Sequence, residues 1–158
     1  MMDLYTWLET TALATWVREA PTIWAYATIL TLHTFGMGVL VGASMVLSLR
    51  LLGVGGTVPL MPLRILFRVV WVGFSVNLAT GAMLFMADAS GRGTQALFFT
   101  KLLFVATGVV SVILIERNVY GGNTDPPVVS ATAKRLAFLS LVAWVAAITA
   151  GRLLAYVR

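Results

Sequence analysis

The sequence predicts an all-α membrane protein, an antiparallel four-transmembrane-helix bundle with an N-terminal interfacial amphipathic helix. Composition is the first observation behind this prediction: 59% of the 158 residues are hydrophobic and 11% are charged, whereas about a quarter of the residues in an ordinary soluble domain are charged. The second observation is that the charges mark the ends of long apolar segments. With no cysteine, the chain has neither disulfides nor thiolate metal sites.

Residues 1–20 form the predicted interfacial helix. Asp3 can cap the N-terminus of one helix that runs through most of this stretch, and apolar residues recur along it at helical spacing. The stretch is too polar to span a membrane, whereas Trp7 and Trp16 are typical of the headgroup region. Pro21 is expected in the first turn of the next helix, where its missing N–H is tolerated.

Four apolar segments within residues 21–158 are long enough to cross a hydrocarbon core of about 30 Å. Gly, Pro, Asn and Asp are concentrated in the three short connections between them, and Ser130 or Thr132 can cap the last helix. Connections this short make neighbouring helices antiparallel. The expected transmembrane helices are residues 22–49, 63–87, 96–119 and 133–156.

Lys and Arg are divided unequally between the two ends of the predicted bundle. The end with the first and third connections has six flanking basic residues, and the opposite end has three, leaving aside Lys101 and Arg152, which lie inside apolar segments. Because basic loops stay in the cytoplasm, this bias places both termini outside. Basic residues at two membrane surfaces also argue against nucleic-acid binding.

Four polar residues are expected in the outer half of the membrane. His33, the only histidine, lies about 16 Å inside the first helix, and Asn77 lies at a similar depth in the second. Lys101 and Arg152 lie about 8 Å and about 6 Å from the outer ends of the third and fourth helices. Ionisable groups at such depths are costly, which predicts a functional site. The alternatives are that both cations snorkel to the interface, that Asn77 only bonds a neighbouring helix, and that His33 is a satisfied core group.

Small residues recur at one-turn spacing on two of the predicted helices. These stripes are Gly73, Asn77 and Gly81 in the second helix and Thr34, Gly38 and Gly42 in the first. Such stripes let a neighbouring helix approach closely, so both are expected to face another helix. A bundle packed in this way can leave a slot for a flat ligand over His33. Met37, one turn away, is either a further ligand or a gap-filling side chain.

Four segments resemble a family of short bacterial four-helix integral membrane proteins that is carried as a domain of unknown function. They read LHTFGMGVLVGASMVLSLRLLG, WVGFSVNLATGAMLFMADA, FFTKLLF and LSLVAWVAAITAGRLLAY. The resemblance covers about residues 16–156 and implies a bacterial inner (cytoplasmic) membrane protein, whose termini would then be periplasmic. It implies no activity.

A first-helix His with nearby Gly and a third-helix Phe-x-x-Lys are also similar, more distantly, to the CopD membrane domain of copper resistance and to the HemJ-type protoporphyrinogen oxidase. That similarity implies His33 as an axial haem ligand and Lys101 as its polar partner. Because the chain has one histidine, two histidines of one protomer cannot share an iron.

Three functional hypotheses remain open. The first is a b-type haem or quinone site for electron transfer, with His33 as the metal ligand or hydrogen-bond partner. The residues expected around it are Lys101, Arg152, Asn77 and Met37. The second is a structural or accessory subunit, packed in a homo-oligomer or a larger membrane complex. The third is the handling of copper or another small solute.

Overall fold

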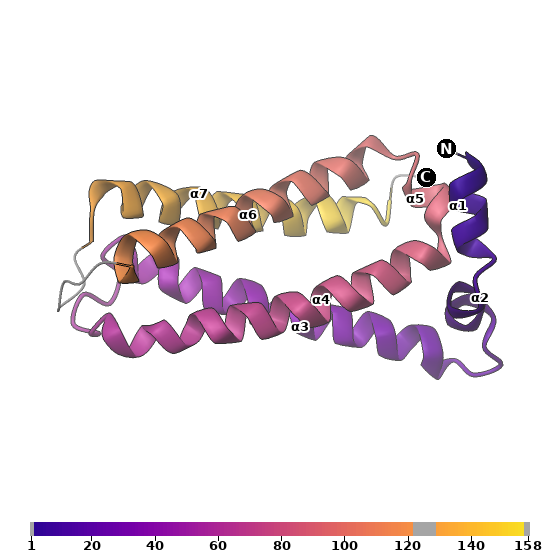
Figure 1. The fold of residues 1–158 in the computed structure, drawn as a ribbon, viewed down its shortest axis with the longest axis horizontal. Helices are drawn as coiled ribbons and strands as arrows, with labels where there is room; N and C mark the ends of the chain where they lie inside the picture. Colours follow the sequence, from indigo (N-terminus) through magenta and orange to yellow (C-terminus); the bar gives the residue numbers. More distant parts are fainter. Residues whose placement is uncertain (1, 122–128, 157–158) are drawn as a thin grey trace.

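The computed structural model describes residues 2–121 and 129–156, and every regular element in these ranges is a helix. Four segments are long and apolar enough to cross a membrane: α3 (Trp24–Leu51), α4 (Ile65–Ala87) with the preceding 3-10 turn η1 (Met61–Arg64), α6 (Ala96–Tyr120) and α7 (Ala131–Leu153). Three short helices, α1 (Met2–Glu9), α2 (Ala12–Glu19) and α5 (Ala89–Arg92), lie together at one end of the bundle (Figure 1). We call this the α5 end and the opposite one the η1 end. The predicted all-α membrane fold is confirmed.

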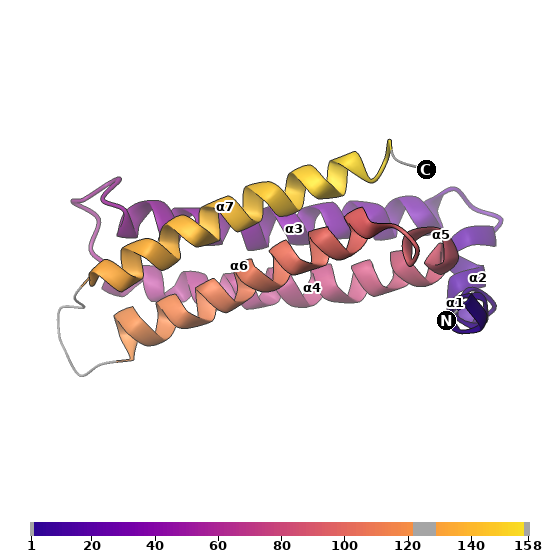
Figure 2. The same ribbon diagram turned by 90° about the horizontal axis from the view of Figure 1, so that it is seen from above.

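The four long helices form two antiparallel hairpins, α3–α4 and α6–α7, which pack on each other mainly through α3 and α7 (Figures 1 and 2). The main apolar core lies in the η1 half and is centred on residues such as Leu40, Phe67, Ile115 and Trp144. A second, smaller cluster at the α5 end joins α2, α3 and α4 through Val17, Ile29 and Ala87. His33 therefore lies on the part of α3 between two separate apolar clusters.

Helices α3 and α4 approach each other closely at two glycines. A Cβ atom at Gly73 would lie 2.7 Å from the backbone nitrogen of Leu40, and one at Gly36 would lie 3.1 Å from the backbone nitrogen of Asn77. Only residues without a side chain allow backbones to come this near. The stripe of Gly73, Asn77 and Gly81 therefore faces α3, which confirms its predicted packing role.

The second predicted stripe does not face a neighbouring helix. Thr34, Gly38 and Gly42 are exposed, and a Cβ atom at either glycine would meet nothing within 4 Å. The prediction was wrong because α3 is apolar all round, so its sequence does not reveal which side faces the bundle. Gly36, about 200° around the helix from Gly38, makes the close contact instead.

The N-terminal segment is two short helices where one was expected. The hydroxyls of Thr10 and Thr11 donate to carbonyls of the last turn of α1, and Thr11 then caps α2 by accepting a hydrogen bond from the Ala14 backbone N–H. Asp3 lies inside the first turn of α1, so it is not the N-cap. Pro21 precedes α3, which begins at Trp24.

Helix α1 lies across the end of the bundle, roughly perpendicular to its long axis (Figures 1 and 2). The Glu9 carboxylate accepts hydrogen bonds from the backbone N–H and the hydroxyl of Ser90, at 2.7 and 2.5 Å. The ring of Tyr5 meets the edge or face of Phe85 at a right angle. Trp7 and Trp16 are exposed by 61% and 53%, as expected for side chains at a membrane interface.

The helix ends otherwise follow the sequence closely. Ser130 caps α7 by accepting from the Ala133 N–H, one of the two predicted caps. Helix α7 begins two residues before the predicted start and ends at Leu153, three residues before the predicted end. The Gly- and Pro-containing part of the third connection, residues 122–128, lies outside the described residues.

The close approach of α3 and α4 predicts opposite results for two glycine substitutions. Gly73→Ala places a methyl group against the backbone of Leu40, so the helices must separate and the free energy of unfolding should fall by about 1–3 kcal/mol. Gly42→Ala adds the same methyl group in open space and should cause no loss. Thermal unfolding of the purified variants in one detergent measures both. Equal losses would contradict the observed helix pairing.

The docking of α1 should depend on pH through Glu9. The hydroxyl of Ser90 is the main reason that the pKa of the Glu9 carboxyl lies below its ordinary value of 4.5. A lowered pKa in the folded state means that this stabilisation is complete above pH 4.5 and is lost as the pH falls through the lower, folded-state value.

We expect hydrogen exchange in α1 to accelerate below pH 4.5, after correction for the intrinsic exchange rate. In Glu9→Gln the corrected exchange should be faster at neutral pH and should not change further on acidification. A wild-type profile that is flat over the same range would contradict the prediction.

Candidate functional site

The His33 side chain is held between α3 and α4 by one polar contact and one glycine. Its Nδ1 atom lies 3.0 Å from the Thr80 hydroxyl. A Cβ atom at Gly81 would lie 3.1 Å from the imidazole Cε1, so the missing side chain at this position makes room for the ring. His33 is half-buried and Thr80 is buried. The imidazole thus has a defined position on the α4 side of α3.

The Thr80 hydroxyl also determines which ring nitrogen carries the proton in the neutral imidazole. Its hydrogen is directed to the carbonyl oxygen of Val76, 2.6 Å away. The Thr80 oxygen is therefore left to accept, and Nδ1–H of His33 is the donor. In this tautomer Nε2 keeps its lone pair. No hydrogen bond from any described residue reaches Nε2.

Asn77 bonds the backbone of α3. Its side-chain amide donates to the carbonyl oxygen of His33 at 2.9 Å, one turn along α4 from the Thr80 contact. A hydrogen bond between membrane helices is the simpler of the two roles considered for Asn77, and it positions the residue that carries the imidazole. Asn77 is therefore a positioning residue in this site.

Lys101 lies on α6, on the side that faces α7 at Gly151. A Cβ atom at Gly151 would lie 3.5 Å from Cε of Lys101 and 3.9 Å from its ammonium nitrogen. No described residue accepts a hydrogen bond from the ammonium or forms an ion pair with it. Helix α6 buries no residue between Ala96 and Thr107, so Lys101 is only half-enclosed.

Arg152 and Met37 are less closely tied to this site. Arg152 is exposed, and its side chain has no hydrogen bond or ion pair with a described residue. Met37 is half-buried against the main apolar core. This position matches the gap-filling role considered for it. Met37 lies one turn from His33 on the same helix.

Thr80 and Arg92 are two residues of the site region that the sequence did not single out. Arg92 donates to Asp88 at 3.0 Å and to the carbonyl oxygen of Leu154 at 2.9 Å, so it fastens α5 to the end of α7. Threonine is common in membrane helices, so the signal for Thr80 was weak: it directly precedes Gly81 and follows Asn77 by three residues.

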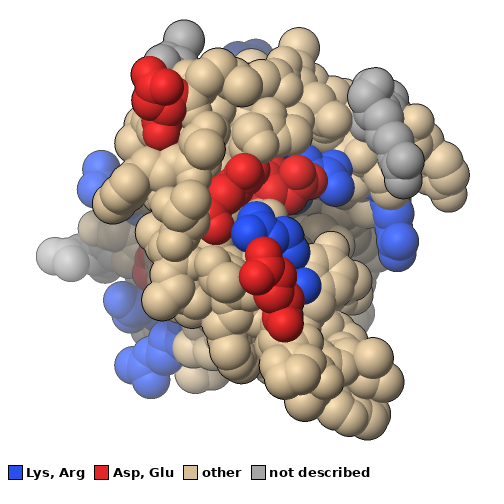
Figure 3. Space-filling model, turned by 90° about the vertical axis from the view of Figure 1, so that its right-hand side faces the viewer, with Lys and Arg blue, Asp and Glu red and all other residues tan. Residues whose placement is uncertain are grey.

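Acidic and basic side chains adjoin near the middle of the α5 end, seen face-on in Figure 3. The ion pairs among the described residues are Arg18 with Glu19, at 2.9 Å, and Arg92 with Asp88, at 3.0 Å. With the Glu9–Ser90 contact, they cover the end of the bundle nearest to His33 and Lys101. Below them, the rings of Phe85 and Phe98 stack at 5.1 Å and connect α4 to α6.

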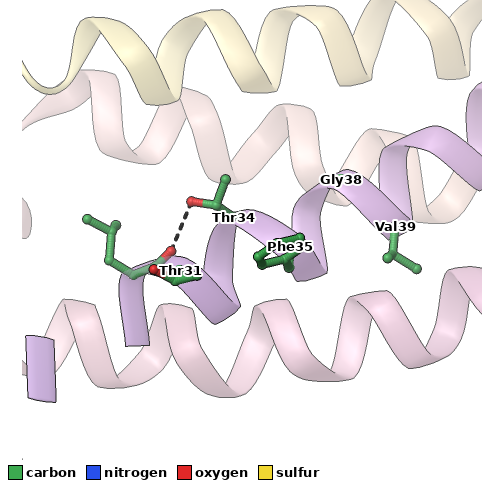
Figure 4. A pocket seen from close by; sticks show the side chains of 6 residues that line it. Thr31, Thr34, Phe35, Gly38 and Val39 are labelled. Atoms are coloured by element: carbon green, nitrogen blue, oxygen red, sulfur yellow. Dashed lines mark hydrogen bonds between the residues drawn. The ribbon is translucent and has the colours of Figure 1, made fainter. Parts of the chain in front are cut away.

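The exposed stripe of α3 borders a groove of about 470 Å³ (Figure 4). Thr31, Thr34 and Gly38 contribute small or polar surface to it, and Phe35 forms part of its apolar surface. The Thr34 hydroxyl donates to the carbonyl of Leu30 within the same helix, so it presents no free hydrogen. The predicted homo-oligomer or larger membrane complex stays a prediction, and this groove is a surface at which another transmembrane helix can pack.

Metal ligands do not gather elsewhere in the described part of the chain. No group of three or more His, Asp or Glu side chains there could hold a metal ion.

The fold and the site together define a class: a multi-pass membrane protein with four long apolar helices in the described ranges, and with an imidazole and an ammonium that has no partner among the described residues in one half of the bundle. No protein-family model, curated protein or solved structure matches this chain. The resemblance of the sequence to a bacterial family of unknown function therefore stays a prediction.

The orientation of Thr80 predicts one tautomer for His33. Because this is the only histidine, nitrogen NMR of ¹⁵N-histidine-labelled protein gives signals from a single ring. Neutral imidazole in the wild type should carry its proton on Nδ1, whereas Thr80→Val, which removes the acceptor, should give a mixture of tautomers. Thr80→Ser keeps the hydroxyl and is the matched control. A proton on Nε2 in the wild type would contradict the assignment.

Proposed function

We propose that this chain is a membrane redox protein that binds b-type haem through Nε2 of His33. The observation that carries the proposal is the hydrogen bond between Nδ1 of His33 and Thr80, because it leaves Nε2 as a lone-pair donor. Axial histidines commonly donate their other ring N–H to a neighbouring acceptor, which fixes the ring and strengthens it as a ligand. Thr80 is such an acceptor.

The remaining residues fit the edge of a haem site. Lys101 is a half-buried cation without a partner among the described residues, and a haem propionate would supply the missing negative charge. Asn77 holds the backbone of His33, and Gly81 leaves space for the ring. A bound haem would supply one-electron transfer, with a potential set by its axial ligand and the low polarity around it.

A quinone is the second candidate for the same site. The lone pair of His33 Nε2 can accept a hydrogen bond from a quinol hydroxyl, and the Lys101 ammonium can donate to a quinone carbonyl. A quinone would use both the acceptor and the cation, which has no partner among the described residues. The two candidates share the electron-transfer function and differ in whether the purified protein absorbs visible light.

An absorption spectrum of protein purified from haem-replete cells tests the proposal. We expect a Soret band that His33→Ala abolishes, that Thr80→Val weakens, and that Met37→Leu leaves in place because Met37 packs in the core. A colourless preparation would contradict haem binding.

Solvent extraction then tests the second candidate: a quinone should co-purify with the wild type and with Arg152→Met but be depleted in Lys101→Met. Absence of both cofactors would contradict the proposed function.

We also propose an orientation in a bacterial inner membrane, with the α5 end and both termini in the periplasm. The η1 end carries the larger set of flanking basic residues, which favours the cytoplasm: Arg50, Arg64, Arg68, Arg117, Lys134 and Arg135. The cofactor site would then lie in the periplasmic half of the membrane, where it could exchange electrons with a partner on that side.

Fusions to the C-terminus test this orientation. Alkaline phosphatase, which folds in the periplasm, should be active after Arg158, and green fluorescent protein at the same position should be dark. In fusions truncated within residues 53–60, between α3 and η1, the two reporters should behave in the opposite way. Fluorescence from the C-terminal fusion would overturn the proposed orientation.

A further inference from the structure

Three buried side chains of α6 and α7 carry polar atoms, and only one of these atoms has a hydrogen-bond partner among the described residues. Ser140 and Trp144 lie one turn apart on α7 and are exposed by 0% and 2%. Neither the Ser140 hydroxyl nor the Trp144 indole N–H has a hydrogen-bond partner among the described residues. Ser111 of α6 is also buried, and its hydroxyl donates to the carbonyl of Thr107 at 2.7 Å.

Other buried serines show what is unusual here. A serine in a membrane helix commonly donates to the carbonyl one turn earlier, as Ser44 and Ser111 do, whereas the hydroxyls of Ser48 and Ser140 have no hydrogen-bond partner among the described residues. Ser140 does not use that bond, although it is fully buried. An indole N–H can only donate, so Trp144 requires an acceptor from another molecule or residue. Buried polar atoms without partners are rare and costly in native proteins.

The antiparallel pairing of α6 and α7 places Trp144 and Ser140 opposite the part of α6 that contains Gly108 and Ser111. A Cβ atom at Gly108 would lie 2.7 Å from Cε2 of Trp144, the ring carbon bonded to the indole nitrogen. The same pairing places Gly151 beside Lys101, about two turns away. Continued one turn toward the η1 end, it sets Ser140 of α7 opposite the segment that contains Ser111 of α6. Trp144 lies one turn nearer to the α5 end than Ser140.

We infer that the α6–α7 interface binds a buried water molecule between Trp144, Ser140 and Ser111. The water accepts a hydrogen bond from the indole N–H and forms a second hydrogen bond with the Ser140 hydroxyl. It donates to the oxygen of Ser111, whose own hydrogen already bonds Thr107. Buried waters typically make about three hydrogen bonds to otherwise unsatisfied groups, and these residues supply that number.

Gly108 belongs to the same site because it lets the indole lie against α6. Any side chain at this position would push the ring away from α6. The site lies in the main core of the η1 half, separate from His33, so it does not depend on the proposed redox function. Its consequence is structural: one water joins the two helices of the α6–α7 hairpin inside an otherwise apolar core.

Indole NMR on the purified protein in detergent tests the site directly. Trp144→Phe assigns the indole resonance among the five tryptophans. We expect a nuclear Overhauser cross-peak between the Trp144 indole proton and water in H₂O, because a long-lived water would lie beside this proton. Ser140→Ala should shift this resonance and weaken the cross-peak. Ser44→Ala, which removes a buried serine bonded to its own helix, should leave both unchanged.

Thermal unfolding supplies a second readout. If one water bridges both residues, Ser140→Ala and Trp144→Phe should each lower the unfolding midpoint, and the double variant should fall by clearly less than the sum of the two. Additive losses, or an indole resonance that has no water cross-peak and ignores Ser140→Ala, would overturn the proposal. Because both substitutions retain most of the buried apolar surface, folded protein is expected for every variant.

Discussion

The close approach of the α3 and α4 backbones at Gly36 and Gly73 is the contact on which the candidate site depends. The bonds that define the imidazole, from His33 to Thr80 at 3.0 Å and from Asn77 to the His33 carbonyl at 2.9 Å, both cross this interface. They can form only while the backbones remain close, and only glycine permits that distance. The packing at these two glycines therefore places Thr80 and Asn77 against His33.

Polar groups inside the spanning helices fall into two groups by their partners. Most of the hydroxyls, including those of Thr34, Ser44, Thr80 and Ser111, donate to the carbonyl one turn earlier and cost little in an apolar medium. The exceptions are informative. Nε2 of His33 and the Lys101 ammonium have no partner among the described residues, and both side chains are only half-buried. Trp144 and Ser140 also have no partner among the described residues, but they are buried in the core.

Much of this architecture could be predicted from the sequence, because hydropathy and turn residues determine where spanning helices begin and end. The stripe of Gly73, Asn77 and Gly81 and the cap at Ser130 were recognised for the same reason: local spacing carries their role. The facing of α3 could not be predicted. Its apolar residues surround the helix, so Gly36 and Gly38 differ only in which neighbours the tertiary fold brings to them. The break at Thr10 and the part played by Thr80 depend in the same way on contacts with distant segments or on single hydroxyls.

The central claim is that the His33 imidazole faces the interior of the bundle, toward the helix that carries Lys101. Because the chain has no cysteine, introduced cysteine pairs report one proximity at a time. In native membranes, His33→Cys combined with Lys101→Cys should be joined by a short bifunctional maleimide. Leu32→Cys combined with Leu103→Cys, at positions exposed by 47% and 65%, should not be joined. Joining of the second pair but not the first would show that the imidazole faces lipid and would contradict the account.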